Sequence, residues 1–187
     1  MIKYTGERIY LRYYDIADAA AKLSLLIGNR DFSQQYLYTH DDSYYTFTAQ
    51  LSNIEQGTTE RNQDKKYAFG IFLVATNELI GDVSFFEIER GFLEKCMIGY
   101  WLDQRYNGKG YMTEAVALAI KIAFGELHFH RIEAGVMPRN PGSIRVLEKT
   151  WFKKEGLARK NVRINGKWED HLMFAILDED VHPAPSV

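Results

Sequence analysis

Residues 105–113 read R-Y-N-G-K-G-Y-M-T and form the most informative segment of this sequence. They lie between an apolar, strand-like run at 96–102 and an amphipathic helical run at 113–124. A glycine-rich turn between a strand and a helix directs several backbone N–H groups towards one point, at the positive end of the helix dipole. Gly108 and Gly110 allow a positive φ and the close approach of a ligand. The segment therefore predicts a phosphate-binding loop.

Two common phosphate motifs do not fit this loop. The magnesium-nucleotide loop needs a Lys followed by Ser or Thr, but Lys109 is followed by Gly110. The dinucleotide fingerprint needs a third glycine where Thr113 stands, in a βαβ unit at the start of a parallel sheet. Pairs of glycines are also common in turns that bind nothing, so a purely structural turn is the competing interpretation.

Length and composition favour one globular domain. The chain has 187 residues, of which 46% are hydrophobic, which is enough to bury a sizeable core. We expect the domain to cover residues 1–177 and the remainder, 178–187 with Pro183 and Pro185, to be a flexible tail.

Charge, cysteine and histidine usage exclude several functional classes. A formal net charge of −2 gives no general basic surface for nucleic acid, and no apolar run is long enough to cross a membrane. The N-terminus lacks a hydrophobic leader and Cys96 has no cysteine partner, so we expect a reducing, cytoplasmic setting. His128 and His130 are two residues apart and the other histidines are distant in sequence, so no metal site is predicted.

Hydrophobic patterns predict a mixed α/β sheet. Strands are expected at 8–13, 67–75, 79–88, 94–102, 131–136, 152–162 and 167–177, and helices at 15–29, 41–56, 113–124 and 141–149. Short turns at 77–78 and 90–91 favour antiparallel pairing before the glycine loop, and Asn165-Gly166 predicts a hairpin. Gly57 is expected to end the second helix. Alternating strands and helices after the loop favour parallel pairing there.

The glycine loop and its surroundings resemble a known signature. In the GNAT acyltransferase superfamily, an Arg or Gln, two residues, a Gly, one residue and a second Gly bind the pyrophosphate of acetyl-CoA, and Arg105, Gly108 and Gly110 fill those places. Flanking words resemble the RimJ/RimL-type branch, which acetylates ribosomal-protein N-termini. They are I-G-Y-W-L (98–102), G-Y-M-T-E-A (110–115), H-R-I-E-A (130–134), N-P-G-S-I-R-V-L-E-K (140–149) and N-G-K-W-E-D-H (165–171).

This resemblance, which spans residues 7–177, implies a fold and an activity. The GNAT fold has a mixed central sheet flanked by helices, antiparallel in its N-terminal half, with a splayed parallel pair at the cofactor site. The splayed strands here would be 97–102 and 132–136. The implied activity is N-acetylation of a primary amine by direct attack on acetyl-CoA, with no metal.

The resemblance also implies a cofactor site. Residues 99–102, with Tyr100, Trp101 and Leu102, would pair through their backbone with the pantetheine amides. The remaining expected cofactor-binding residues are Arg105, Asn107, Gly108, Lys109, Gly110, Tyr111, Met112, Thr113, Asn140 and Arg145. For Arg105, Lys109 and Arg145 the competing interpretation is a solvated charge, and for Asn140 it is a helix N-cap.

The acid that assists the leaving CoA thiolate is expected at Ser143. Many GNAT enzymes have a Tyr at the position of Leu147, whereas the RimL-like branch is proposed to use a Ser at the position of Ser143. Positions 143 and 147 share one face of a helix, so Ser143 can reach the place of the missing phenol. The competing interpretation is a Ser that caps its own helix. No base stands out among the acidic residues Glu87, Glu89, Glu169 and Asp170.

The acceptor is the open question. A protein N-terminal amine is the first expectation, a small amine such as a polyamine, amino acid or aminoglycoside is the second, and an acyl-CoA-binding module without catalysis is the third. The oligomeric state is left open. Trp151 departs from the family pattern, which has Gly there, so we expect a changed turn or a new packing partner.

Overall fold

An eight-stranded mixed sheet runs through the molecule, and the structure, a computed structural model, describes residues 2–181. The strands lie in the order β1-β2-β3-β4-β5-β6-β8-β7. Their bounds are β1 Tyr4–Thr5, β2 Ile9–Tyr13, β3 Tyr67–Leu73, β4 Leu79–Glu89, β5 Lys95–Leu102, β6 Arg131–Val136, β7 Lys153–Ile164 and β8 Lys167–Leu177.

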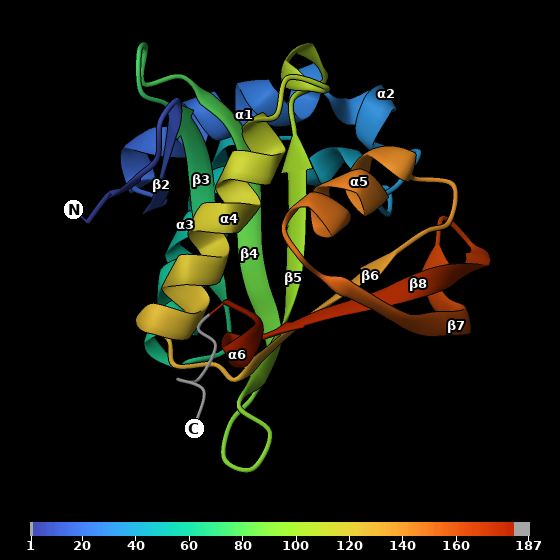
Figure 1. Ribbon diagram of the computed structural model, residues 1–187. Coiled ribbons are helices and arrows are strands. Elements are labelled where there is room, and N and C mark those ends of the chain that lie inside the picture. The colour runs from blue at the N-terminus through green and yellow to red at the C-terminus, as the bar shows by residue number, and fades with distance from the viewer. Residues whose placement is uncertain (1, 182–187) are drawn as a thin grey trace.

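Helices cover both faces of this sheet (Figure 1). They are α1 Ala19–Gly28, α2 Arg30–Ser33, α3 Phe47–Asn62, α4 Tyr111–Gly125, α5 Pro141–Lys149 and α6 Asp178–Val181, with the short 3-10 helices η1 Ile16–Asp18, η2 Asp42–Tyr44 and η3 Gln104–Tyr106. α4 and α5 lie on the face towards the viewer, and α1 and α3 lie behind the sheet. The buried side of α4, which includes Ala115, Ala119 and Ala123, packs on the sheet with small residues that allow a close approach.

The parallel pair at the centre of the sheet opens along its length. All neighbouring described strands pair antiparallel except β5 and β6, which pair through Lys95 with Arg131, Cys96 with Ile132, and Met97 with Glu133. Along the described chain this register stops at Met97, whereas β5 stays paired with β4 as far as Leu102. The mixed fold and the splayed parallel pair that the sequence predicts are therefore confirmed.

Within the described residues, the parallel pairing expected around the glycine loop is found between β5 and β6 alone. β8 lies between β6 and β7 and is antiparallel to both of them. The hairpin at Asn165 and Gly166 explains this order, because both residues have positive φ, of 49° and 84°, which suits a tight β-turn. The last strand therefore folds back beside β7 and takes the position next to β6.

The second long helix is also displaced from its predicted range. Asp41 caps the short η2, and the helix α3 starts after Thr46, whose side chain accepts a hydrogen bond from the Ala49 N–H. α3 then passes through Gly57 and ends at Asn62. A glycine in a helix interior costs only about 1 kcal/mol relative to alanine, which the contacts of α3 with α1 and β3 offset.

The C-terminal segment continues beyond the predicted end of the domain. Asp178–Val181, assigned to the tail by the sequence analysis, form α6, and Asp180 accepts hydrogen bonds from Lys153 and from the backbone N–H of Leu177. The rest of that predicted tail, 182–187, lies outside the described residues. Within residues 2–181, no helix has the length and apolar content needed to span a membrane.

Candidate active site

The glycine loop connects the open end of β5 to α4. Gly108 and Gly110 have φ of 75° and 84°, so both occupy the left-handed region that favours glycine. Gly110 is the N-cap residue of α4, and the first intrahelical bond runs from the Glu114 N–H to the Gly110 carbonyl at 3.1 Å. The N–H groups of residues 111–113 precede that bond and point out of the helix end. This end of α4 therefore has the geometry of an anion site.

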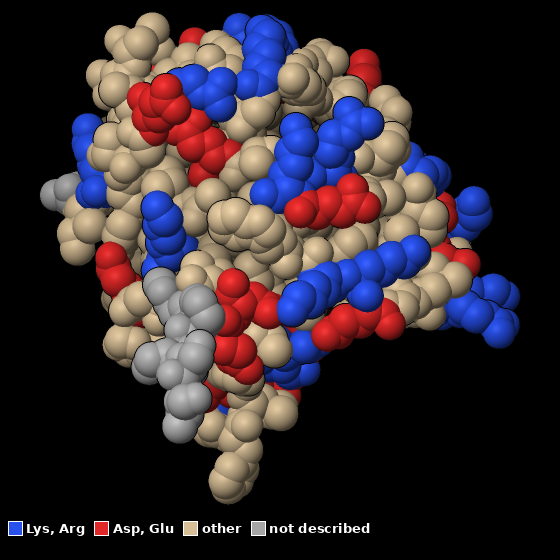
Figure 2. All heavy atoms as spheres, in the orientation of Figure 1, with Lys and Arg blue, Asp and Glu red and all other residues tan. Residues whose placement is uncertain are grey.

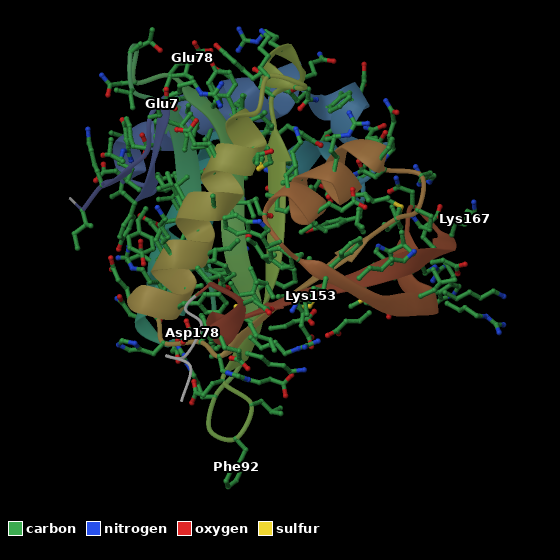
Figure 3. The ribbon with its side chains drawn as sticks, in the orientation of Figure 1. Glu7, Glu78, Phe92, Lys153, Lys167 and Asp178 are labelled. Carbon is green, nitrogen blue, oxygen red and sulfur yellow. The ribbon has the colours of Figure 1, made fainter. Side chains whose placement is uncertain are left out.

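Arg105 lies beside this loop but is paired with carboxylates. Its guanidinium donates to Asp103 at 2.6 and 2.9 Å and to Glu78 at 3.0 Å. Glu78, labelled in Figure 3, lies in the turn before β4 and also accepts a hydrogen bond from Tyr106. Burial acts to raise the pKa of Asp103, but the hydrogen bonds from Arg105 outweigh it and lower that pKa. Arg105 thus fastens the loop to the sheet as well as adding positive charge.

Arg8 binds the loop from the other side, and this role of Arg8 was not predicted from the sequence. Its Nη1 donates to the Lys109 carbonyl at 2.9 Å, and its Nε donates to Glu114 Oε2 at 2.9 Å. Its Nη2 lies 3.3 Å from the place a Cβ on Gly110 would occupy, and its guanidinium stacks on the Tyr111 ring at 4.6 Å. One arginine therefore contacts the loop and the first turn of α4 together.

Glu114 completes this brace. Burial would raise its pKa, but hydrogen bonds from the backbone and side chain of Arg8 and from the Ile9 N–H lower it. The one available signal in the sequence was the carboxylate of Glu114 itself. A negative charge in the first turn of a helix is stabilised by the helix dipole, but it repels a bound anion, so a cation beside it favours anion binding.

The other expected cofactor-binding residues in and beside the loop differ in their burial. Leu102 and Met112 are buried in the core, so their backbones alone can meet a ligand. Asn107 and Lys109 are exposed, and the Lys109 ammonium donates to the Arg105 carbonyl at 2.9 Å. Thr113 is partly buried on the first turn of α4.

The strand β5 places its side chains on opposite faces of the sheet. Trp101 packs behind the sheet against the buried cluster of Tyr10, Leu25, Phe72 and Leu79. Tyr100 points to the front, and its hydroxyl lies 3.0 Å from Ser143 Oγ and 3.2 Å from the Ser143 carbonyl oxygen. β5 therefore contributes backbone to the gap and a phenol to its α5 side.

The start of α5 brings Asn140 and Ser143 to the same gap. Asn140 is the N-cap residue, because its Oδ1 accepts from the Ser143 N–H at 3.1 Å. The hydroxyl of Ser143 contacts Tyr100 on β5, so its interaction is with the strand across the gap. Any role of Asn140 in ligand binding stays a prediction.

Positive charge gathers over α5 on the face that carries the glycine loop (Figure 2). Arg145 and Lys149 are exposed on this helix. Exposed cations close to an anion site attract phosphate groups. Arg145 is exposed on a helix that lies on the same face of the sheet as α4, and its role in binding stays a prediction.

The acidic residues weighed as bases are mostly engaged elsewhere. Glu89 pairs with Lys95 at 3.0 Å, Glu169 pairs with Arg139 at 3.2 Å, and Asp170 accepts from the Lys160 N–H at 2.7 Å. Those three carboxylates therefore hold strand ends and hairpins.

A further carboxylate faces the back of the sheet. Asp82 accepts a hydrogen bond from the Tyr14 hydroxyl at 2.9 Å, and burial raises the pKa of both groups. Burial therefore favours the protonated form of this carboxyl group more than exposure to water would. This pair could not be predicted from the sequence, because Tyr14 and Asp82 are 68 residues apart and meet only in the folded chain.

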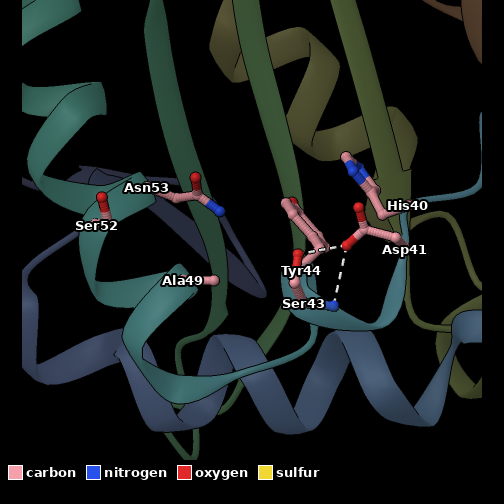
Figure 4. Close-up of a pocket in the computed structure, with 7 residues that line it drawn as sticks. All are labelled: His40, Asp41, Ser43, Tyr44, Ala49, Ser52 and Asn53. Carbon is pink, nitrogen blue, oxygen red and sulfur yellow. Dashed lines mark hydrogen bonds between the residues drawn. The ribbon is translucent and has the colours of Figure 1, made fainter.

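A polar pocket lies at the start of α3, with a volume of about 310 Å³ (Figure 4). It is lined by His40, Asp41, Ser43, Tyr44, Ala49, Ser52 and Asn53. The His40 ring stacks on Tyr44, and Asp41 accepts hydrogen bonds from the N–H and hydroxyl of Ser43. Residues 36–45 include Tyr36, Tyr38, Tyr44 and Tyr45, and part of this tyrosine-rich stretch thus lines a pocket. No group of acidic, His and Cys side chains within residues 2–181 is arranged to hold a metal.

Trp151 does not change the turn as expected. It has φ of 65°, in the same left-handed region a glycine would use, and 69% of its surface is exposed. Its N–H bonds the Glu148 carbonyl and the Phe152 N–H bonds the Leu147 carbonyl, which is the Schellman pattern. The turn after α5 is therefore preserved with a strained residue in it.

Comparison with known families identifies a match over most of the chain. The family model described as "Acetyltransferase (GNAT) domain" matches residues 8–153. The matched range includes the glycine loop, both splayed strands and α5.

Individual proteins are similar over nearly their full length. "Probable N-acetyltransferase YjcK" of Bacillus subtilis (strain 168) is 53% identical over 94% of this chain and 97% of that protein. "[Ribosomal protein uS5]-alanine N-acetyltransferase" of Escherichia coli (strain K12) is 30% identical over 97% and 94%. Mycobacterium smegmatis RimJ, solved in complex with CoA-disulfide, superposes with a TM-score of 0.88 at 28% identity, over 94% of this chain and 84% of that one.

Proposed function

This chain belongs to the GNAT acetyltransferase family as an N-acetyltransferase of the RimJ/RimL type, and we propose that it transfers the acetyl group of acetyl-CoA to a protein N-terminal α-amine. We also propose a cytoplasmic location and a single domain, predicted over residues 1–177 and extended by α6, Asp178–Val181.

The observation that carries the proposal is the position of the anion site at the end of the splayed strands. The N–H groups of residues 111–113 and the positive end of α4 suit a pyrophosphate. Gly108 leaves open space, because nothing lies within 4 Å of the place its Cβ would take. Residues 98–102 lie beyond the β5–β6 register, so their backbone is available to pair with the amides of a pantetheine arm. The residues present therefore fit acetyl-CoA.

The reaction needs few groups from the protein. The acceptor nitrogen attacks the acetyl carbonyl carbon, a C–N bond forms, and the C–S bond breaks with its electron pair passing to sulfur. Ser143 stabilises the sulfur as charge develops there, and water takes the surplus proton of the amine. No covalent enzyme intermediate is required, because the amine is itself the nucleophile.

An α-amine is the acceptor favoured by two observations. The Escherichia coli relative acts on an alanine of a ribosomal protein, as its name states. An α-amine also has a reference pKa of about 7.7–8.0, so a good fraction of it is neutral at about pH 7–8. A Lys amine has a reference pKa of about 10.4 and needs a base to become neutral. Because Glu89, Glu169 and Asp170 are paired with other groups, the site favours an acceptor that is already partly neutral without a base, as an α-amine is.

The test is release of free CoA thiol from acetyl-CoA in the presence of defined acceptors. We expect turnover with a peptide that begins with free Ala or Ser, and none with the same peptide blocked at its N-terminus and carrying an internal Lys. Polyamines, free amino acids, aminoglycosides and a no-acceptor sample complete the panel. Turnover on a small amine alone would move the proposal to that class, and acetyl-CoA binding without turnover on any amine would contradict catalysis.

A further inference from the structure

The Tyr100 side chain joins the two elements on either side of the gap. It starts on β5 beyond the last residue paired with β6, and its hydroxyl reaches the first turn of α5. The ring is partly buried and packs against the main core, as does Ile144 on α5. The phenol is therefore fixed next to Ser143 by packing as well as by hydrogen bonds.

The two hydroxyl groups can share their protons in two ways. Tyr100 can donate to the Ser143 carbonyl oxygen at 3.2 Å, in which case its own oxygen accepts the Ser143 proton at 3.0 Å. Alternatively, Tyr100 donates to Ser143 Oγ, and the single proton of Ser143 is then free to point elsewhere. Only the second arrangement lets Ser143 donate to a leaving sulfur.

We infer that Tyr100 is a positioning residue for acetyl transfer, which donates to Ser143 Oγ and directs the Ser143 proton towards the thioester sulfur. This inference rests on the proposed function of Ser143. A hydroxyl that accepts one hydrogen bond becomes a stronger donor in the next one, because hydrogen bonds in a chain polarise each other. Tyr100 thus supplies, from a strand, the phenol that is missing at Leu147.

The two hydroxyl groups stay neutral in this scheme. Burial raises the pKa of Tyr100, so its phenol remains protonated and remains a donor at every working pH. A thiol has a reference pKa of about 8.5, far below that of either hydroxyl, so neither gives up its proton outright. The C–S electron pair goes to sulfur, Ser143 stabilises it by a hydrogen bond, and CoA takes its proton from water.

A purely structural role makes a different prediction. If Tyr100 only ties α5 to β5 through the Ser143 carbonyl, its removal weakens the enzyme whether or not the Ser143 hydroxyl is present. If it acts through that hydroxyl, its removal has no effect once the hydroxyl is gone. A double-mutant cycle separates the two roles.

The experiment compares wild type, Tyr100→Phe, Ser143→Ala and the double variant, with kcat and KM for acetyl-CoA measured on the best acceptor. We expect Tyr100→Phe to lower kcat about 10-fold, the factor that corresponds to loss of about 1.4 kcal/mol from one neutral hydrogen bond, with KM for acetyl-CoA changed less than twofold. In the Ser143→Ala background it should lower kcat by less than twofold. In a Ser143→Thr background, which keeps a hydroxyl, the 10-fold loss should return.

The control is Tyr67→Phe on β3, which removes the hydrogen bond that the Tyr67 hydroxyl donates to Asp64 and should leave kcat unchanged. Thermal unfolding of all variants reports any structural loss. Equal losses of kcat in the two Ser143 backgrounds, or no loss in Tyr100→Phe, would overturn the role of Tyr100 and leave the proposed function standing. Absence of turnover in the wild type with every amine would overturn both.

Discussion

Replacing Arg8 by alanine should weaken acetyl-CoA binding, although Arg8, the residue before β2, is far from the loop in sequence. Its guanidinium makes two hydrogen bonds of 2.9 Å, to the Lys109 carbonyl and to Glu114. A hydrogen bond from a charged donor contributes about 1.5–3 kcal/mol when buried. The Arg8 side chain is 42% exposed, so we take about 1–2 kcal/mol for the pair together.

Loss of this free energy would make the loop less ordered and would therefore weaken the binding of CoA. A loss of about 1.4 kcal/mol raises Kd tenfold. We therefore expect Arg8→Ala to raise Kd for CoA about 10-fold in calorimetric titration. The loss should shrink at high salt if the positive charge of Arg8 attracts the pyrophosphate directly.

The matched control is Arg90→Ala. Arg90 makes a similar set of bonds to Asp64 and Glu94, but it lies at the β4–β5 hairpin at the opposite end of β5 from the glycine loop. It should lower the unfolding temperature and leave Kd for CoA within twofold. If Arg8→Ala also leaves Kd within twofold, or if both variants weaken binding equally, the reasoning about the brace is refuted.

Three further changes probe other parts of the molecule. Gly110→Asp should raise Kd for CoA by roughly 100-fold in calorimetry. A side chain at this left-handed φ costs about 1–2 kcal/mol of backbone strain, and the carboxylate adds repulsion of the pyrophosphate. Gly110→Ala should show the effect of the strain alone, at about 10-fold. Trp151→Gly should raise the unfolding temperature by about 2–4 °C in a thermal melt. Glycine removes the backbone strain of Trp151 at φ 65°, and this gain exceeds the cost of the extra chain entropy of glycine by up to about 1 kcal/mol. An unchanged or lower unfolding temperature would contradict this. Asp64→Asn should destabilise the folded protein at pH 7 and make little difference near pH 2. The hydrogen bond from Arg90 lowers the pKa of Asp64, so its stabilising effect is lost as pH falls through the folded-state pKa. Thermal melts that show the same difference at every pH would argue against the ion pair.

Prediction from the sequence succeeded where a few neighbouring residues determine the backbone. Gly108 and Gly110 take the positive φ that the loop required, and Asn165 with Gly166 forms the predicted hairpin. Pro141 begins α5 as expected from its fixed φ. These features depend on local conformational preference, which a single sequence expresses directly.

It failed where two distant segments meet. Arg8 and Glu114 are 106 residues apart, and no local pattern indicates that they pair. The position of β8 between β6 and β7 depends on which strand fits beside β6, and alternation of strands and helices does not determine that. For the same reason the Tyr100 hydroxyl was overlooked, since the pattern of β5 identifies a strand but not the helix that faces it.

The splayed pair also bears on aggregation. An unpaired strand edge is a template for joining another chain, and the outer edge strand β7 carries Lys153, Lys154, Arg159, Lys160 and Arg163, charges that oppose such joining. The gap between β5 and β6 creates a second free edge in the middle of the sheet, and its residues 98–102 are apolar or glycine. α4 and α5 lie on the front of the sheet at this gap (Figure 1), and we expect this cover to admit a narrow amide chain more readily than another protein strand. The protein can thus keep an uncharged pairing edge for its ligand without exposing that edge to other copies of itself.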